Sequence, residues 1–125
     1  MEETGNEKLA RFLTSRNHYS PKNKAVKARA FLPPNDKLSV FCVGDMPYSK
    51  IVTLGSNINL SDTRRLHGHA IIVERHVSDT GLAVHRDDSP FRHANILGWP
   101  PEKDKRMDIA QELAAAADLF LHRIQ

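Results

Sequence analysis

The chain of 125 residues has the usual size of one domain, and a domain of this size buries roughly two-thirds of its unfolded surface on folding. Its 40% hydrophobic and 26% charged residues, with a net charge of +3, exclude an intrinsically disordered protein. A single cysteine excludes an intramolecular disulfide, and neither a signal peptide nor a membrane span is predicted. We therefore expect one cytoplasmic domain over residues 1–125.

The N-terminal part of the chain is rich in cations. Residues 2–13 are predicted to form a short helix, after which the turn formers of residues 15–24 interrupt any regular pattern. Residues 8–35 contain seven Lys and Arg and no Asp or Glu. We interpret residues 1–25 as a basic arm that either keeps the protein soluble or binds a polyanion such as nucleic acid. The candidate nucleic-acid-binding residues are Lys22, Lys24, Lys27 and Arg29.

Two hairpins with a helix between them are predicted for the middle of the chain. Residues 26–32 alternate apolar and polar side chains as a half-buried strand does, and the apolar run 38–43 is typical of a more buried strand. Pro47 and Gly55 bound a predicted helix at residues 46–54. Residues 67–77 and 82–86 are predicted as the second hairpin, with its turn at 78–81.

A long C-terminal helix completes the predicted fold. From Glu102 onward, apolar side chains recur at spacings of three and four, which predicts a helix of about six turns. The predicted order after the arm is β-β-α-β-β-α. The fold class is therefore α+β, a mainly antiparallel sheet packed against the long C-terminal helix. The apolar positions of this helix are Met107, Ala110, Leu113, Ala114, Ala117, Phe120, Leu121 and Ile124.

The segment SPFRHANILGWPP, residues 89–101, concentrates polar and aromatic side chains between two proline-marked boundaries. An extended stretch here places His93 and Asn95 on one face, opposite Arg92. A histidine can transfer protons, an asparagine can orient it, and an arginine can receive an anion. We name these three as candidate ligand-binding residues and His93 as the candidate catalytic residue. The alternative is purely structural, a connection in which Trp99, Pro100 and Pro101 start the last helix.

The other histidines and the single cysteine provide weaker evidence for a functional site. His67 and His69 would share one face of a strand and, with His76, His85 or His93, form a metal site. No cysteine pair or HExxH motif accompanies them, so we predict neither a metal nor a cofactor. Cys42 lies in an apolar run, where a thiol is usually a small buried hydrophobe rather than a nucleophile. The Walker, GxSxG and GxGxxG motifs are absent from the sequence.

Several short motifs together resemble those of a widespread group of small uncharacterised bacterial proteins. They are RNHYS at 16–20, KARAF at 27–31, LSVF at 38–41, GLAV at 81–84 and SPFRHANILGWP at 89–100. The resemblance spans most of the chain and implies a bacterial protein with a single domain. It brings no activity that can be transferred to this chain.

These observations leave three functions open. The first is a binding or accessory module that meets a protein partner or a ligand at residues 89–101. The second is nucleic-acid binding through the basic arm. The third is a small metal-independent ribonuclease of toxin type, with His93 as acid or base and Arg92 on the phosphate. Because no catalytic motif is present, we rank the binding module first and the enzyme last.

Overall fold

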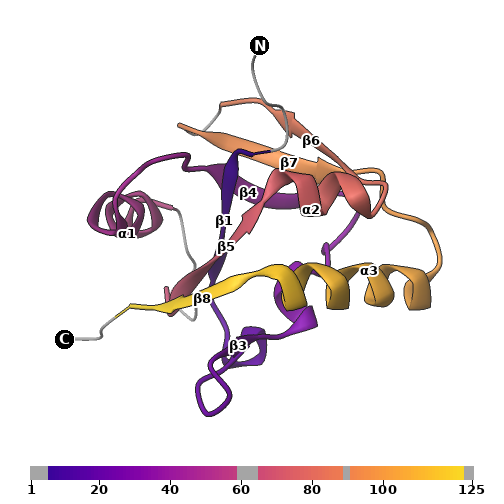
Figure 1. Cartoon of the computed structure of the whole chain (residues 1–125), viewed down its shortest axis with the longest axis horizontal. Helices are drawn as coiled ribbons and strands as arrows, with labels where there is room; N and C mark the ends of the chain where they lie inside the picture. The colour runs from indigo at the N-terminus through magenta and orange to yellow at the C-terminus, as the bar shows by residue number, and fades with distance from the viewer. Residues whose placement is uncertain (1–5, 59–64, 89–90, 123–125) are drawn as a thin grey trace.

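One six-stranded antiparallel sheet organises the chain in this computed structural model, which describes residues 6–58, 65–88 and 91–122 (Figure 1). The strands of this sheet are β1 (Lys8–Leu13), β4 (Leu38–Cys42), β5 (Gly68–Val73), β6 (Ala83–Arg86), β7 (His93–Leu97) and β8 (Asp118–Leu121). Their spatial order is β6-β7-β4-β1-β5-β8. The helices are α1 (Tyr48–Ser56), α2 (Glu74–Asp79) and α3 (Lys103–Ala116). The predicted α+β class with a mainly antiparallel sheet is confirmed.

Between β1 and β4 the chain makes an excursion away from the sheet, residues 15–32. It contains two short 3-10 helices and a two-stranded ribbon, which lie at the bottom of Figure 1. These elements are η1 (Arg16–His18), β2 (Tyr19–Ser20), β3 (Ala25–Val26) and η2 (Ala28–Phe31). The excursion packs through Val26, Ala30 and Phe31, all buried, into the core beneath α3.

The helix predicted for residues 2–13 is wrong for residues 8–13, and residues 2–5 lie outside the described residues. Residues 8–13 form β1, which pairs with β4 on one side and β5 on the other. A central strand with both faces covered buries nearly all its side chains, so the apolar pattern loses its alternation. Leu9 and Leu13 are buried on one face, and Ala10 and Phe12 on the other.

The first predicted hairpin is also wrong. The strand expected at residues 26–32 stops at Val26, and η2 follows it. Arg11 contributes to this local structure because its Nε donates to Ala30 O at 2.8 Å. Its guanidinium also donates to Ser39 O at 3.0 Å, which links the excursion to β4. The strand predicted at 38–43 is confirmed as β4, and its partners are β1 and β7.

The second predicted hairpin does not form either. The predicted strand 67–77 divides into β5 and the short helix α2, which buries Val77. β5 then pairs with β1 and β8, whereas β6 pairs with β7. The strand at 82–86 and the helix at 46–54 are confirmed, as β6 and α1.

The C-terminal helix is shorter than predicted. α3 ends at Ala116, and residues 118–121 form an edge strand, β8, along β5. Gly68 permits this pairing, because a Cβ at that position would collide with the backbone carbonyl of Phe120. Among the described residues, the apolar stripe is therefore buried only over the helical part, at Ala110, Leu113 and Ala114, and Ile124 lies outside the described residues.

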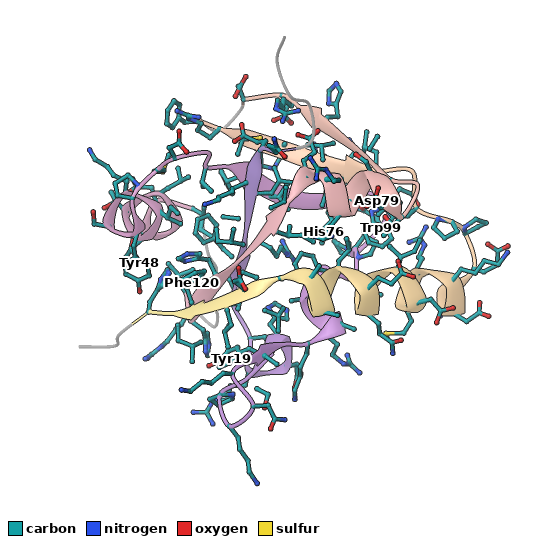
Figure 2. All side chains as sticks on the ribbon, viewed as in Figure 1. Tyr19, Tyr48, His76, Asp79, Trp99 and Phe120 are labelled. Carbon is teal, nitrogen blue, oxygen red and sulfur yellow. The ribbon has the colours of Figure 1, made fainter. Side chains whose placement is uncertain are left out.

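The two faces of the sheet carry separate cores. α2, α3 and η2 cover the first face, in which Trp99 is buried and donates from Nε1 to Ile96 O at 3.0 Å (Figure 2). α1 covers part of the second face, over Phe12, Phe41 and Val43. No helix in the described part of the chain is long and apolar enough to cross a lipid bilayer.

Candidate functional site

The polar half of the 89–101 segment lies on the second face of the sheet. β7 places Ala94 and Ile96 in the core of the first face, where both are fully buried. His93 and Asn95 alternate with them and therefore project from the opposite face. His93 lies against Phe41, with ring centroids 5.4 Å apart in an edge-to-face arrangement. The predicted alternation is thus found in the structure.

Both ring nitrogens of His93 are hydrogen-bonded. Nε2 lies 2.6 Å from the hydroxyl Oγ of Ser39, and Nδ1 lies 2.7 Å from Oδ1 of Asp87. The His93 side chain is 13% exposed and that of Asp87 is 34% exposed. The three side chains therefore form a chain of hydrogen bonds at the surface of the sheet, partly open to solvent.

Asp87 is held in place from several directions. Its second oxygen accepts a hydrogen bond from Asn95 Nδ2 at 3.2 Å. The backbone N–H groups of Asp87 and Asp88 both donate to the carbonyl oxygen of His93, at 3.2 and 3.0 Å. Asn95 thus positions the carboxylate, and the end of β6 is fixed against the start of β7.

These contacts define the tautomer of a neutral His93. A carboxylate only accepts hydrogen bonds, so Nδ1 must carry the proton that is shared with Asp87. Nε2 then holds a lone pair and accepts the hydroxyl proton of Ser39. A nucleophile beside a base that a third group orients is the geometry of nucleophilic catalysis.

His93 and Asn95 were predicted from the sequence as members of one site, whereas Ser39 and Asp87, which the structure joins to them, were not. Ser39 is 54 residues from His93 and reaches it only because β4 and β7 are neighbours. In their register Ser39 pairs with Asn95, and Phe41 pairs with His93, so Ser39 and His93 are diagonal neighbours on one face. The alternation in residues 38–42 signals that Ser39 leaves the core, but the predicted partner strand was wrong.

Arg92 does not join this cluster. Its backbone has a φ of 69°, and its guanidinium lies 5.4 Å from the centre of the exposed Phe91 ring. It lines a separate hollow whose walls include Glu7, Asp45 and Lys50. The structure therefore brings together two of the three predicted ligand-binding residues, His93 and Asn95, and directs the Arg92 side chain to a different hollow.

The four basic residues proposed for nucleic acid, Lys22, Lys24, Lys27 and Arg29, are all exposed on the excursion. The excursion packs against the first face of the sheet, whereas His93 projects from the second. A ribonuclease site that combines His93 with these cations would need both on one surface. The two groups instead form two separate regions.

Three of the other histidines, His67, His69 and His122, are engaged in contacts away from this cluster. His67 Nδ1 lies 2.8 Å from the Tyr19 hydroxyl, and His69 Nδ1 lies 2.6 Å from His122 Nε2. No group of three His, Cys, Asp or Glu side chains within residues 6–58, 65–88 and 91–122 could hold a metal ion. Burial raises the pKa of the Cys42 thiol, so this side chain is a poor nucleophile.

Comparisons with known proteins add no family to this geometry. The chain matches no protein-family model, no curated protein and no solved structure. Its function must therefore be inferred from the site itself.

Proposed function

We propose that this protein is a small hydrolase that transfers acyl groups through Ser39. The proposal rests on two consecutive hydrogen bonds. One joins Ser39 Oγ to Nε2 of His93 at 2.6 Å, and the other joins Nδ1 of His93 to Asp87 at 2.7 Å. In this proposal Ser39 is the nucleophile, His93 is the general base and Asp87 orients the imidazole.

The chemistry is acyl transfer in two steps. Ser39 Oγ attacks the carbonyl carbon of an ester while its proton passes to His93 Nε2. As the bond to the alcohol breaks, His93 gives that proton to the departing oxygen. Water then attacks the acyl-serine by the same route, which releases the carboxylic acid and restores the hydroxyl. Asp87 stabilises the imidazolium that forms in each step.

An apolar groove near the site indicates the class of acyl group. This groove has a volume of about 200 Å³, and its exposed lining is mostly apolar, with Met46, Leu54 and Phe91 beside Lys50, Thr53 and Asn57. Met46 and Leu54 pack on the cluster that contains Phe41, whose ring contacts His93. A groove of this size and polarity suits a short apolar acyl chain better than a charged one.

Hydrolysis of p-nitrophenyl acetate, butyrate and octanoate tests the proposal. We expect turnover above the rate in buffer, with butyrate or octanoate preferred to acetate, and its loss in Ser39→Ala. Ser78→Ala is the matched control because Ser78 is exposed on α2 and takes no part in the site. Turnover that survives Ser39→Ala, or none with any of the three esters, would overturn the proposal.

A binding role for the same segment is the second candidate, and one observation favours it. Phe91 is 67% exposed, and the guanidinium of Arg92 lies 5.4 Å from the centre of its ring. Exposed aromatic and arginine side chains are typical anchors of protein interfaces. Capture of one dominant bacterial partner by the wild-type chain, and its loss with Phe91→Ala but not Phe120→Ala, would support this role. Equal capture by both variants would reject it.

Nucleic-acid binding is the third candidate and rests on the exposed cations of the excursion. Binding to the phosphate backbone releases counterions, so affinity should fall steeply with salt. Neutral replacements at Lys22, Lys24, Lys27 and Arg29 should flatten this dependence. An unchanged salt slope would reject the excursion as the binding surface.

A further inference from the structure

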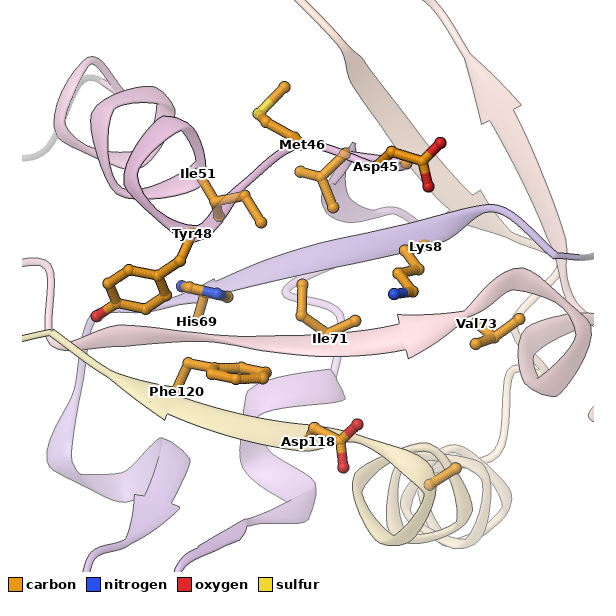
Figure 3. A pocket seen from close by; sticks show the side chains of 13 residues that line it. Lys8, Asp45, Met46, Tyr48, Ile51, His69, Ile71, Val73, Asp118 and Phe120 are labelled. Atoms are coloured by element: carbon orange, nitrogen blue, oxygen red, sulfur yellow. The ribbon is translucent and has the colours of Figure 1, made fainter.

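A second site lies on the same face of the sheet, on the other side of β1. It is a cavity of about 410 Å³ between α1, β5 and β8, and apolar side chains such as Ile51 from α1 and Ile71 from β5 line it (Figure 3). Cavities of this size and polarity bind small molecules. Ser39, Asp87, His93 and Asn95 do not line it, and Met46 is shared with the apolar groove.

One end of the cavity is aromatic. Tyr48, His69 and Phe120 meet there, and the rings of His69 and Phe120 stack with centroids 5.2 Å apart. The ring of Tyr48 lies 5.7 Å from His69 and 6.4 Å from Phe120. Both Tyr48 and Phe120 remain partly exposed, at 47% and 40%, although they are large aromatic side chains. These exposed rings offer a stacking surface to a planar ligand.

The hydrogen bond between His69 and His122 determines what His69 presents to the cavity. Its Nδ1 lies 2.6 Å from His122 Nε2, and the other nitrogen of His122, Nδ1, is buried without a partner among the described residues. A buried N–H without an acceptor is rarer than a buried lone pair without a donor. His122 therefore carries its proton on Nε2 and donates it to His69. The Nε2–H of His69 is then directed away from His122 as a free donor.

His69 is uncharged in this arrangement at neutral pH. Burial, together with the nearby His122, lowers the pKa of His69 to about 4. The aromatic end of the cavity thus offers one neutral N–H donor among apolar rings. A group that accepts a hydrogen bond without carrying a full charge suits this position.

The other end of the cavity is charged. Lys8, Asp45 and Asp118 line it and lie away from the aromatic rings (Figure 3). Among the described residues, no ion pair joins the Lys8 ammonium to either carboxylate within 4.0 Å. One cation and two anions therefore remain available to a ligand that carries both charges.

The spacing between the two ends fits a single aromatic ring. Phe120 and Asp118 are two residues apart on β8, which corresponds to about 7 Å along a strand. This is comparable to the distance from the ring centre of an aromatic α-amino acid to its amino nitrogen. A ligand that stacks on Phe120 can therefore reach Asp118 with an amine.

We infer that this cavity binds an aromatic α-amino acid whose ring carries a hydroxyl group, such as free tyrosine. The ring stacks against Tyr48 and Phe120, and its hydroxyl oxygen accepts the Nε2–H of His69. The ammonium pairs with Asp118, and the carboxylate faces Lys8. The site binds this ligand reversibly and needs no covalent step.

Calorimetric titration of the full chain with four ligands tests each part of this inference. Tyrosine should bind most tightly. Tyramine lacks the carboxylate, 3-(4-hydroxyphenyl)propionate lacks the ammonium, and phenylalanine lacks the ring hydroxyl, so each should bind about tenfold more weakly or worse. Equal affinity for all four, or no binding of tyrosine up to its solubility limit, would overturn the inference.

Two charge variants test the charged end separately. Asp118→Asn should weaken tyrosine about tenfold but leave 3-(4-hydroxyphenyl)propionate unchanged. Lys8→Met should weaken tyrosine and leave tyramine unchanged. Asp79→Asn and Lys37→Met are matched controls, because both residues are exposed and neither lines the cavity. Loss of tyrosine binding in the controls, or its retention in both site variants, would contradict the assignment.

Ser39→Ala separates this inference from the proposed hydrolase. Because Ser39 does not line the cavity, that variant should bind tyrosine as the wild type does. A loss of ester hydrolysis with tyrosine binding intact is the expected result. Loss of tyrosine binding in Ser39→Ala would contradict the separation of the two sites.

Discussion

Ser39 and Asp87 approach the same histidine from opposite sides of its ring. Ser39 Oγ lies 2.6 Å from Nε2 of His93, and Asp87 Oδ1 lies 2.7 Å from Nδ1. The two contacts come from different strands, β4 and the end of β6, and β7 lies between them. The pairing of three strands thus assembles side chains that are scattered over more than fifty residues.

The orienting role of Asp87 predicts a specific effect of Asp87→Asn. An amide can donate to Nδ1, which would move the ring proton to Nε2 and remove the lone pair that Ser39 needs. We expect the rate of ester hydrolysis to fall by about 10³-fold or more, as expected for the wrong tautomer. Asp88→Asn is the control, since only the backbone of Asp88 contacts His93. Equal rates in Asp87→Asn and the wild type would exclude this role.

The lowered pKa of His69 predicts that the folded chain loses stability in acid. Its pKa is about 4 in the folded chain and 6.5 in the unfolded chain, so only the unfolded chain takes up the proton between these values. Stability therefore falls as the pH drops from about 6.5 to 4, and this contribution is constant below pH 4. Burial lowers the pKa of His122 as well, in the same direction.

The magnitude can be measured by urea denaturation at pH 7 and pH 5. Over this interval His69 should account for a loss of about 2 kcal/mol in the free energy of unfolding. His69→Phe should show a correspondingly smaller loss, whereas His76→Gln, at an exposed position on α2, should behave as the wild type. The same pH dependence in His69→Phe and the wild type would contradict the assignment to His69.

The close approach of β8 to Gly68 predicts that an added methyl group is not tolerated at this position. A Cβ there would collide with the backbone of Phe120 and Leu121, so Gly68→Ala should push β8 away from β5. We expect a destabilisation of about 1–3 kcal/mol in thermal unfolding. Gly81→Ala, where the added carbon meets nothing within 4 Å, separates this collision from a general effect of the substitution. Because Gly81 has a φ of 90°, a smaller cost of backbone strain is expected in that control.

The burial of Cys42 predicts that its thiol reacts only after the chain unfolds. Its side chain is buried, and burial raises its pKa, so little thiolate forms at neutral pH. The thiol should react with Ellman's reagent in denaturant within seconds and in native buffer at the much slower rate of unfolding. Rapid reaction of the folded chain would show that Cys42 is accessible.

Local patterns predicted several elements correctly and both of the predicted hairpin pairings wrongly. The apolar run at 38–43 and the alternation in the 89–101 segment each report which side of a strand is buried, and both strands exist. Pairing depends on contacts that no local window contains. The run at 118–121 continues the helical spacing of α3, and only the edge of β5 and the missing side chain of Gly68 turn it into a strand.

The candidate site, too, could be predicted from the sequence only in part. His93 and Asn95 project from one face of a short strand, as their spacing indicates. Ser39 and Asp87 could not be assigned to them, because the partner strand of residues 38–43 was predicted to be 26–32 rather than β7. His122 was predicted to lie on a helix, so its pairing with His69 was also missed.

Covalent labelling tests the central claim most directly. A fluorophosphonate probe reacts with a serine only when a neighbouring base makes its hydroxyl nucleophilic. Intact-mass and peptide mass spectrometry should locate a single adduct on Ser39, abolished in Ser39→Ala and slowed at least about tenfold in His93→Ala. No adduct on the folded wild-type chain, or an adduct rate at Ser39 that does not depend on His93, would contradict the proposed nucleophile.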